Sequence, residues 1–390
     1  MKTIAIGVAG LGRAFSLMAP AFAADARVRL VAAADPRPEA LRQFERDFSA
    51  TGYAEVEALC ADPRVEVVYV ATPHQLHAEH ACLAASRGKH VLVEKPMALG
   101  LEECGAMIAA ARRHGVRLVV GPSHSFDAPV RRARELIAGG AYGRLRMISA
   151  LNFTDFLYRP RRPEELDPAR GGGAVLNQAA HHVDIVRLLG GARVKSVRAG
   201  TGAWDPARGA EGAYSAFLSF EDGVFASITY SGYARFDSDE LCGWIGESGQ
   251  PKSPDAYGAA RRLLAADELA QKNARNYGGS AYAPPPAAVA HPHFGLLIAS
   301  CEHADLRLLP QGVMIYADGE KRLEPLPLPR TPRVEVIDEV YAAVAEGRPP
   351  LHGGEWGAAT VEVCLALLRS AREEREIALP SPPSPTASPT

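Results

Sequence analysis

A lysine at the end of a predicted strand is the first residue whose position suggests chemistry. Residues 90–93 form a short apolar run that is followed by Glu94, Lys95 and Pro96. Proline cannot donate to a sheet ladder, so the strand must stop there and present Lys95 at its carboxyl end. Ligands of open α/β sheets bind outside the carboxyl ends of the strands. The sequence therefore predicts that Lys95 lies in a ligand-binding cleft.

A second set of polar side chains follows three consecutive glycines at 171–173. Asn177, His181 and Asp184 are spaced i, i+4, i+7 in a predicted helix over residues 174–189, which predicts that they share one helical face. A histidine on that face, beside a lysine at a strand end, would make a proton-transfer pair. The same spacing also fits a core histidine bonded to Asp184, and spacing alone favours this second interpretation.

A glycine-rich turn near the start of the chain predicts a phosphate-binding site. It follows a predicted strand over residues 3–8 and consists of Gly7, Gly10, Leu11, Gly12 and Arg13. Glycines let the backbone approach a pyrophosphate, whose charge the next helix N-terminus stabilises. A second strand over residues 28–34 ends at Asp35, about 20 residues farther on, where an acid would bind the adenosine ribose. This acid favours NAD, while Arg37 keeps NADP possible. The other interpretation is an α/β domain without a cofactor, in which Asp35 caps a helix.

Regularly spaced histidines follow the predicted strand over residues 65–71. Thr72 and Pro73 lead into His74, His77 and His80, which recur every third residue. Such spacing can place metal ligands on one helical face. Because no cysteine and few carboxylates accompany them, the sequence favours capping and surface histidines over a metal site.

The order of predicted elements indicates two domains. Strands and helices alternate up to residue 121, which predicts an α/β Rossmann domain over residues 1–123 with a mostly parallel sheet. In residues 124–379 strands follow helices, which predicts an α+β domain with a large, mostly antiparallel sheet. Residues 246–292 resemble an insertion with one helical run over 256–271, whose role the sequence leaves open. Residues 380–390 are rich in Pro, Ser and Thr and are predicted to be disordered.

Composition excludes several classes of function. The chain has 390 residues and a formal net charge of -2, which gives no reason to expect nucleic acid or an anionic membrane as a partner. The six cysteines are scattered without a CxxC pair, so reduced thiols are expected. Residues 2–23 superficially imitate a secretory signal, but the glycines interrupt the apolar run, and a cytoplasmic location is expected.

Four motifs, in this order, resemble those of the Gfo/Idh/MocA oxidoreductases: Gly7-x-x-Gly10-x-Gly12, Thr72-Pro73…His77, Glu94-Lys95-Pro96 and Gly173…His181-x-x-Asp184. The resemblance implies a Rossmann domain followed by an α+β domain whose sheet face often mediates assembly, here as a homodimer or homotetramer. It implies that Lys95 and His181 lie beside the nicotinamide. The implied cofactor contacts are Gly7, Gly10, Leu11, Gly12, Arg13, Asp35, Arg37, Thr72, Pro73, His74, His77, Glu94 and Lys95. The family usually has Asp where this chain has Asn177, and an amide cannot take a proton.

Further stretches resemble the phthalate 4,5-cis-dihydrodiol dehydrogenase branch of that family: residues 156–166, Asn177-Gln178-Ala179-Ala180-His181, residues 300–307 and Gly354-Glu355-Trp356-Gly357. This resemblance implies oxidation of a cis-dihydrodiol of an aromatic carboxylate to a catechol. His181 would act as base, Lys95 would stabilise the alkoxide and Asn177 would orient a hydroxyl. The implied substrate contacts are Lys95, Tyr158, Arg159, Arg161, Arg170, Asn177 and His181. A sugar or cyclitol dehydrogenase, or a catalytically silent NAD-binding sensor, are the alternatives.

Overall fold

The apolar runs of the N-terminal third form one parallel sheet. The computed structural model describes residues 2–256, 258–264 and 267–380. Its first sheet has the strand order β3-β2-β1-β4-β5-β6, and all of its strand pairs are parallel. Such strands are buried on both faces, which explains their nearly continuous hydrophobicity. The strands are β1 (Ile4–Ala9), β2 (Val28–Ala34), β3 (Thr51–Tyr53), β4 (Val67–Val70), β5 (His90–Val93) and β6 (Leu118–Val120).

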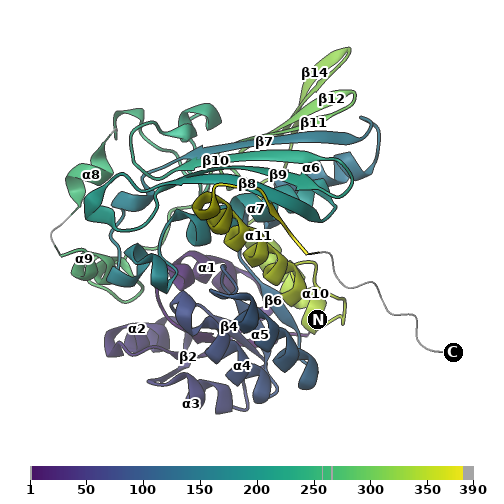
Figure 1. The fold of residues 1–390 in the computed structure, drawn as a ribbon. Coiled ribbons are helices and arrows are strands. Elements are labelled where there is room, and N and C mark those ends of the chain that lie inside the picture. The colour runs from purple at the N-terminus through teal and green to yellow at the C-terminus, as the bar shows by residue number, and fades with distance from the viewer. Residues whose placement is uncertain (1, 257, 265–266, 381–390) are drawn as a thin grey trace.

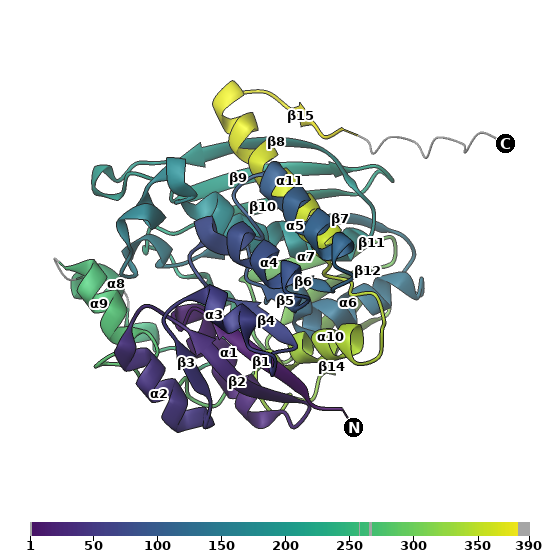
Figure 2. The same cartoon turned by 90° about the horizontal axis from the view of Figure 1, so that it is seen from below.

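Helices cover both faces of this sheet. On one face lie α1 (Arg13–Ala24) and α2 (Pro38–Phe48), and on the other α3 (Val56–Ala61), α4 (His77–Ser86) and α5 (Leu101–Arg113). Two late helices complete these layers, α10 (Val334–Val344) on the first face and α11 (Gly354–Glu373) on the second. The chain therefore returns to the Rossmann sheet after building the second domain (Figure 2).

The second sheet is large and mostly antiparallel, as the sequence predicts. Its strand order is β14-β13-β12-β11-β7-β10-β9-β8-β15, and only β7 and β10 pair in parallel. Three helices cover one face, α6 (Ala128–Ala138), α7 (Ala180–Gly190) and α11 (Figure 1). The strands are β7 (Leu145–Phe153), β8 (Val194–Gly202), β9 (Ala213–Phe220), β10 (Phe225–Ser231), β11 (Leu296–Cys301), β12 (Ala304–Leu309), β13 (Gly312–Ala317), β14 (Glu320–Pro325) and β15 (Ile377–Ala378).

Two helices of the structure differ from those that the sequence predicts. The helix predicted over residues 174–189 starts with a π-helical turn, Val175–Ala179, before α7. The single helix predicted over 256–271 is wrong, because the insertion contains two short helices, α8 (Ala259–Leu263) and α9 (Glu268–Arg275). The chain leaves α8 through an extended conformation at Leu264, where φ is −66° and ψ is 114°. Of the tail predicted to be disordered, residues 381–390 lie outside the described residues.

Two further findings bear on the expectations from composition. All six cysteines lie within the described residues and are free thiols, and Cys60, Cys104, Cys242 and Cys364 are buried. No described helix combines the length and the apolar character that crossing a membrane requires.

Candidate active site

Lys95 lies at the seam between the two domains, at the end of β5. Its ammonium Nζ donates a hydrogen bond to the backbone carbonyl of Asn177 at 3.0 Å, so the strand end of the first domain contacts the helix of the second. Burial, opposed by Glu94 and assisted by the charges of Arg333 and Arg161, lowers the pKa of Lys95 to about 8. The amine therefore exchanges its proton near neutral pH, as proton-transfer groups require.

Asn177 lies within the π-helical turn Val175–Ala179. The Asn177 amide is buried, and its Nδ2 donates to the carbonyls of Gly171 at 3.2 Å and Gly173 at 2.7 Å. Both of its N–H groups are thus engaged by the preceding loop. These bonds hold the start of the helix, and the carbonyl of residue 177 accepts from Lys95, while the role of the amide in orienting a substrate hydroxyl stays a prediction.

His181 lies one turn beyond that carbonyl in an aromatic setting. Its ring centroid is 4.8 Å from that of His124 and 5.0 Å from that of Phe294. Its Nδ1 is 3.3 Å from the hydroxyl of Ser123, a long contact. Burial, together with the positive charge of Lys95, holds the pKa of His181 well below its usual value. The imidazole is therefore neutral at physiological pH and available as a proton acceptor.

Asp184 does not share the environment of His181, although both are on α7. Its carboxylate is buried and accepts hydrogen bonds from Ser125 Oγ and Trp356 Nε1, with Thr360 Oγ1 at 3.4 Å. Ser125 also contacts His352 Nε2 at 2.9 Å. Within the described residues no hydrogen bond joins His181 to Asp184, so the interpretation of a core histidine held by this acid is wrong. Asp184 instead ties α7 to α11.

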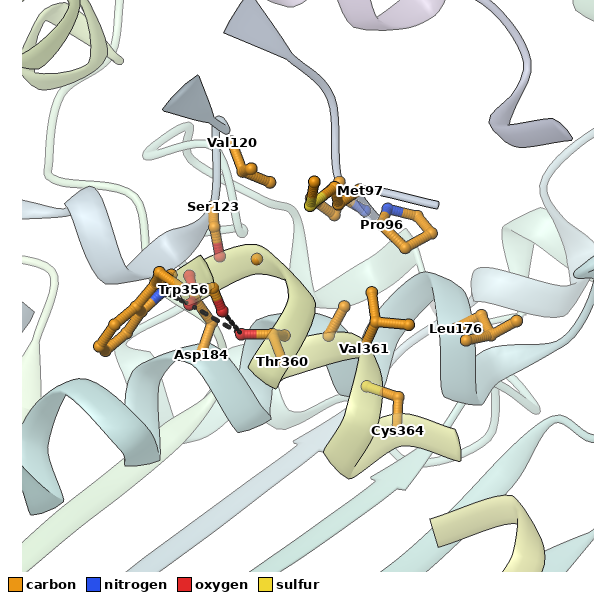
Figure 3. Close-up of a pocket in the computed structure, with 13 residues that line it drawn as sticks. Pro96, Met97, Val120, Ser123, Leu176, Asp184, Trp356, Thr360, Val361 and Cys364 are labelled. Atoms are coloured by element: carbon orange, nitrogen blue, oxygen red, sulfur yellow. Dashed lines mark hydrogen bonds between the residues drawn. The ribbon is translucent and has the colours of Figure 1, made fainter. Parts of the chain in front are cut away.

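A pocket adjoins Lys95 on the side of this acid. It lies between the ends of β5 and β6 and the helices α7 and α11. Figure 3 shows Ser123, Asp184 and Thr360 at one side of the pocket and Leu176 and Cys364 farther away. The lining residues are Lys95, Pro96, Met97, Val120, Ser123, Leu176, Ala180, Asp184, Trp356, Gly357, Thr360, Val361 and Cys364.

The glycine turn after β1 has the shape of a phosphate cradle. Gly10 has φ +93°, and a Cβ added there would be 2.8 Å from the carbonyl oxygen of Ala71. At Gly12 an added Cβ would meet nothing within 4 Å, so the turn is open in front of the first residues of α1, which begins at Arg13. An accessible backbone at a helix N-terminus, with an arginine beside it, fits a dinucleotide pyrophosphate. Gly7 is inside the sheet, where an added Cβ would be 2.9 Å from Leu59.

The acid at the end of β2 contacts the same turn. Asp35 Oδ2 accepts a hydrogen bond from the Leu11 N–H at 2.7 Å, and its other oxygen accepts from the Arg37 backbone N–H at 2.9 Å. Arg37 Nε also donates to Asp35 at 3.0 Å. The carboxylate lies where the sequence predicts a ribose-binding acid, and its partner arginine is not free.

The loop after β4 closes the cradle from the other side. His77 is fully buried, with Nδ1 2.9 Å from the carbonyl of Pro96 and Nε2 3.0 Å from that of Thr72. Burial lowers its pKa to about 4. The expectation of a surface histidine is therefore wrong at this position, because His77 joins the loops after β4 and β5. His80 bonds the Thr72 hydroxyl at 3.0 Å.

Three other predicted cofactor contacts lie around these loops. Burial holds the pKa of His74 well below its usual value, so it is neutral. Pro73 directly precedes it. Glu94 is buried and accepts a hydrogen bond from Tyr69 at 2.6 Å, so its side chain is directed into the domain. In the part of the chain that the structure describes, no group of three His, Cys, Asp or Glu side chains could hold a metal ion.

The predicted substrate contacts between residues 158 and 170 fall into two groups, one near Lys95 and one away from it. Arg159 bonds Asp155 at 2.7 Å and Glu247 at 3.3 Å, and Arg161 stacks on the Phe156 ring at 3.8 Å. The charges of Glu247 and Arg161 both act on the pKa of Lys95, which places this group near the amine. Tyr158 and Arg170 are not in this group. Tyr158 is buried, bonds Asp205 and is covered by Arg261 at 3.8 Å, while Arg170 is exposed.

Several residues of the site were not predicted. Ser123 and His124 follow β6, and the rule that ligands lie at strand ends could have identified them. Phe294 and Arg333 come from distant segments and carry no local signal. Arg333 has a left-handed backbone, φ 70°, and has no side-chain hydrogen bond or ion pair within residues 2–256, 258–264 and 267–380. Its charge lowers the pKa of both Lys95 and His181.

Comparison with known proteins agrees with this geometry. Residues 4–122 match the oxidoreductase family with an NAD-binding Rossmann fold (GFO_IDH_MocA), and residues 130–250 match the GFO/IDH/MocA C-terminal domain. The chain is 50% identical over 378 residues to 1-carboxy-3-chloro-3,4-dihydroxycyclo hexa-1,5-diene dehydrogenase of Comamonas testosteroni, with 95% of each chain covered.

Solved structures agree as well. A protein of Bordetella bronchiseptica RB50 assigned as a dehydrogenase superposes with a TM-score of 0.91 at 41% identity, covering 97% of this chain and 100% of the other. The WlbA dehydrogenase of Bordetella pertussis, in complex with NADH and UDP-GlcNAcA, superposes with a TM-score of 0.68 at 25% identity, covering 98% of this chain and 100% of the other. The chain belongs to the Gfo/Idh/MocA family of NAD-binding oxidoreductases.

Proposed function

We propose that this enzyme oxidises a cis-dihydrodiol of an aromatic carboxylate to the corresponding catechol, with NAD as hydride acceptor. The observation that carries the proposal is the junction of Lys95 with the start of the α7 segment, one turn before a neutral His181. The relative that is 50% identical is named for a substrate of this class, a carboxylated and chlorinated dihydroxycyclohexadiene. The 4,5-dihydro-4,5-dihydroxyphthalate type is the corresponding substrate without chlorine and with two carboxylates.

His181 and Lys95 have separate roles at the carbinol group of the substrate. His181, held neutral by burial, accepts the hydroxyl proton, while the ammonium of Lys95 stabilises the negative charge that develops on oxygen. When bound in the Gly10–Gly12 cradle, NAD⁺ supplies the acceptor for the hydride that leaves the carbinol carbon. The ketone so formed tautomerises to an aromatic catechol, and this aromatisation favours oxidation.

A carboxylated substrate also needs a fixed cation. We propose Arg333 for this contact, because it has no partner in the described residues and its charge acts on both Lys95 and His181. Arg161 stays a second candidate, although its guanidinium already bonds the Phe156 carbonyl at 3.1 Å. Arg333→Gln should raise KM for a carboxylated diol about 10- to 100-fold, in line with one lost charge-assisted contact, while leaving the Kd for NADH nearly unchanged.

The proposal is tested by following NADH formation with a panel of purified substrates. A cis-dihydrodiol of benzoate or phthalate should be turned over with much higher kcat/KM than the same diol without a carboxylate. Preference for inositol or glucose would instead make the enzyme a cyclitol or sugar dehydrogenase. NADH binding without turnover of any polyol would favour a sensor that has lost catalysis.

We further propose that the enzyme assembles as a homodimer or homotetramer in the cytoplasm. The face of the second sheet opposite α6, α7 and α11 carries Phe217 and Phe225, which are exposed and stack on each other with their ring centroids 5.4 Å apart. Apolar pairs on an uncovered sheet favour contact with a second copy. Light scattering should give a mass of two or four chains, and Phe217→Ser combined with Phe225→Ser should lower it.

A further inference from the structure

The insertion between β10 and β11 reaches back to the cofactor domain. Its helix α9 and the residues that follow, up to 282, lie beside the α2 side of the parallel sheet (Figures 1 and 2). We refer to residues 267–282 as the clasp. The sequence leaves the role of this insertion open.

Tyr277 anchors the clasp in the first hydrophobic core. Its side chain is 1% exposed, and its ring centroid lies 5.0 Å from that of Phe15 and 6.5 Å from that of Phe44. Its hydroxyl donates a hydrogen bond to Asp47 at 2.6 Å. Next to it, Gly278 has φ +74°, and an added Cβ would be 2.6 Å from Ala40 Cα. This close approach fixes the main chain of the clasp against α2.

The same anchor restrains Arg37 beside the ribose-binding acid. The carbonyl of Tyr277 accepts a hydrogen bond from an Arg37 terminal nitrogen at 3.3 Å. The other terminal nitrogen donates to the Leu11 carbonyl at 2.8 Å and to Asp35 at 3.2 Å, and Nε donates to Asp35 at 3.0 Å. All three guanidinium nitrogens are therefore engaged, and the arginine lies flat against Asp35.

The other end of the clasp holds the predicted substrate loop. Glu268 accepts hydrogen bonds from the Arg161 backbone N–H at 2.9 Å and from the Arg208 guanidinium at 2.6 Å, and Lys272 bonds Glu165 at 2.6 Å. The clasp is therefore fixed at both ends, and displacement of Tyr277 would leave α9 attached while it releases the contact with Arg37.

We infer that Tyr277 anchors the clasp so that its carbonyl holds Arg37 against Asp35, and that this arrangement reserves the adenosine ribose position for NAD over NADP. The inference rests on the cofactor position proposed above but not on the identity of the substrate. NADP carries a 2′-phosphate, which needs a free cation at the ribose and is repelled by an uncompensated carboxylate. Arg37 is the nearby cation, and the clasp prevents it from turning toward that phosphate.

Fluorescence titration of the purified full-length protein with NADH and NADPH tests this without any substrate. Wild type should bind NADH more tightly than NADPH. Tyr277→Ala should narrow the ratio of the two Kd values about tenfold, the effect of one charge-assisted hydrogen bond made available to the phosphate. Tyr277→Phe keeps the ring and the carbonyl and should retain the wild-type ratio. Val289→Ala, an exposed position in the same insertion, serves as the matched control.

A second background shows whether the effect passes through Arg37. In Arg37→Ala, the further change Tyr277→Ala should leave the ratio of the two Kd values unaltered, because the arginine that would bind the 2′-phosphate is absent. An unchanged ratio in a folded Tyr277→Ala protein overturns the inference, as does an equal shift in the Arg37→Ala background. If circular dichroism shows that Tyr277→Ala does not fold, Tyr277→Leu replaces it, because leucine keeps apolar volume without the aromatic contacts. The ratio of the two Kd values is then read in the same way.

Discussion

At the scale of single residues, the proposed chemistry requires that Lys95 is protonated and that His181 is neutral. Burial disfavours the charged form of both Lys95 and His181, and each positive charge would further disfavour the other. The amine nevertheless keeps a carboxylate neighbour in Glu94, while the imidazole has rings and a hydroxyl around it. The pair therefore consists of one cation and one neutral acceptor near neutral pH, the combination that alcohol oxidation needs.

Removing either group should abolish most of the turnover. We expect Lys95→Ala and His181→Ala each to lower kcat by ~10²–10⁴-fold, because each removes a contact that strengthens in the transition state. The Kd for NADH, measured by fluorescence, should stay nearly the same. Lys321→Ala and His114→Ala, both exposed, are the matched controls. Near-normal turnover in either site variant would contradict the assignment.

The pH profile should show the lowered pKa of Lys95. Because that pKa is about 8, the ammonium is present below pH 8 and is lost above it, so kcat should fall as the pH rises past this value. The pKa of His181 lies well below its usual value, so no loss of rate is expected as the pH falls through about 6.5. Lys95→Arg keeps the charge and should shift the alkaline limb upward, at a lower rate. If the alkaline limb of the Lys95→Arg profile stays at the wild-type pH, the limb is due to a group other than Lys95.

At the scale of elements, the sequence predicted best the strands with a continuous or alternating apolar pattern and the helices with a helical apolar period. The order and type of most elements follow from periodicity, and Lys95 at the end of β5 follows from Pro96. The strands β3, β11, β14 and β15 were not predicted. Of these, β14 is a charged, exposed edge that is defined by its pairing with β13. The π-helical turn was missed for a different reason. There the Asn177 side chain bonds the carbonyls of Gly171 and Gly173, and the i, i+4, i+7 spacing of polar residues does not distinguish a π-helical turn from an α-helix.

Asp184 provides a test at this scale, because it joins α7 to α11. Trp356→Phe retains a ring but removes the indole N–H that donates to this buried carboxylate. We expect the free energy of unfolding to fall by about 1–3 kcal/mol, the usual effect of leaving a buried acceptor short of a partner. Urea denaturation measures it. Trp204→Phe, at a position that is 62% exposed, should change stability little.

At the scale of the whole molecule, the late helices pack against the sheet of the first domain. Apolar residues of α10 belong to the same core as α1 and α2, and the Val120 N–H donates to the His352 carbonyl at 2.7 Å. The Rossmann sheet is thus completed by residues more than half the chain away. The linear order of the motifs could not indicate this return, because an amphipathic helix does not specify which sheet it covers.

This shared core predicts that a change in the C-terminal part affects the nucleotide domain. Ile337 on α10 is 1% exposed, and Ile337→Ala should lower the free energy of unfolding by about 2–5 kcal/mol. Loss of NADH binding should then occur at the same, lower urea concentration as the loss of helical structure. Leu351→Ala, at a position that is 50% exposed, is the control. Nucleotide binding that survives to the wild-type urea concentration would show that the domain is independent of α10.

The hydrogen bond from Lys95 to the main chain of residue 177 has a consequence for engineering and for natural variation. A peptide oxygen is present whatever amino acid occupies the position, so no single substitution can delete it. The acceptor itself is therefore independent of the codon at 177, but its position depends on the amide hydrogen bonds to the carbonyls of Gly171 and Gly173, which the carboxylate of Asn177→Asp cannot make.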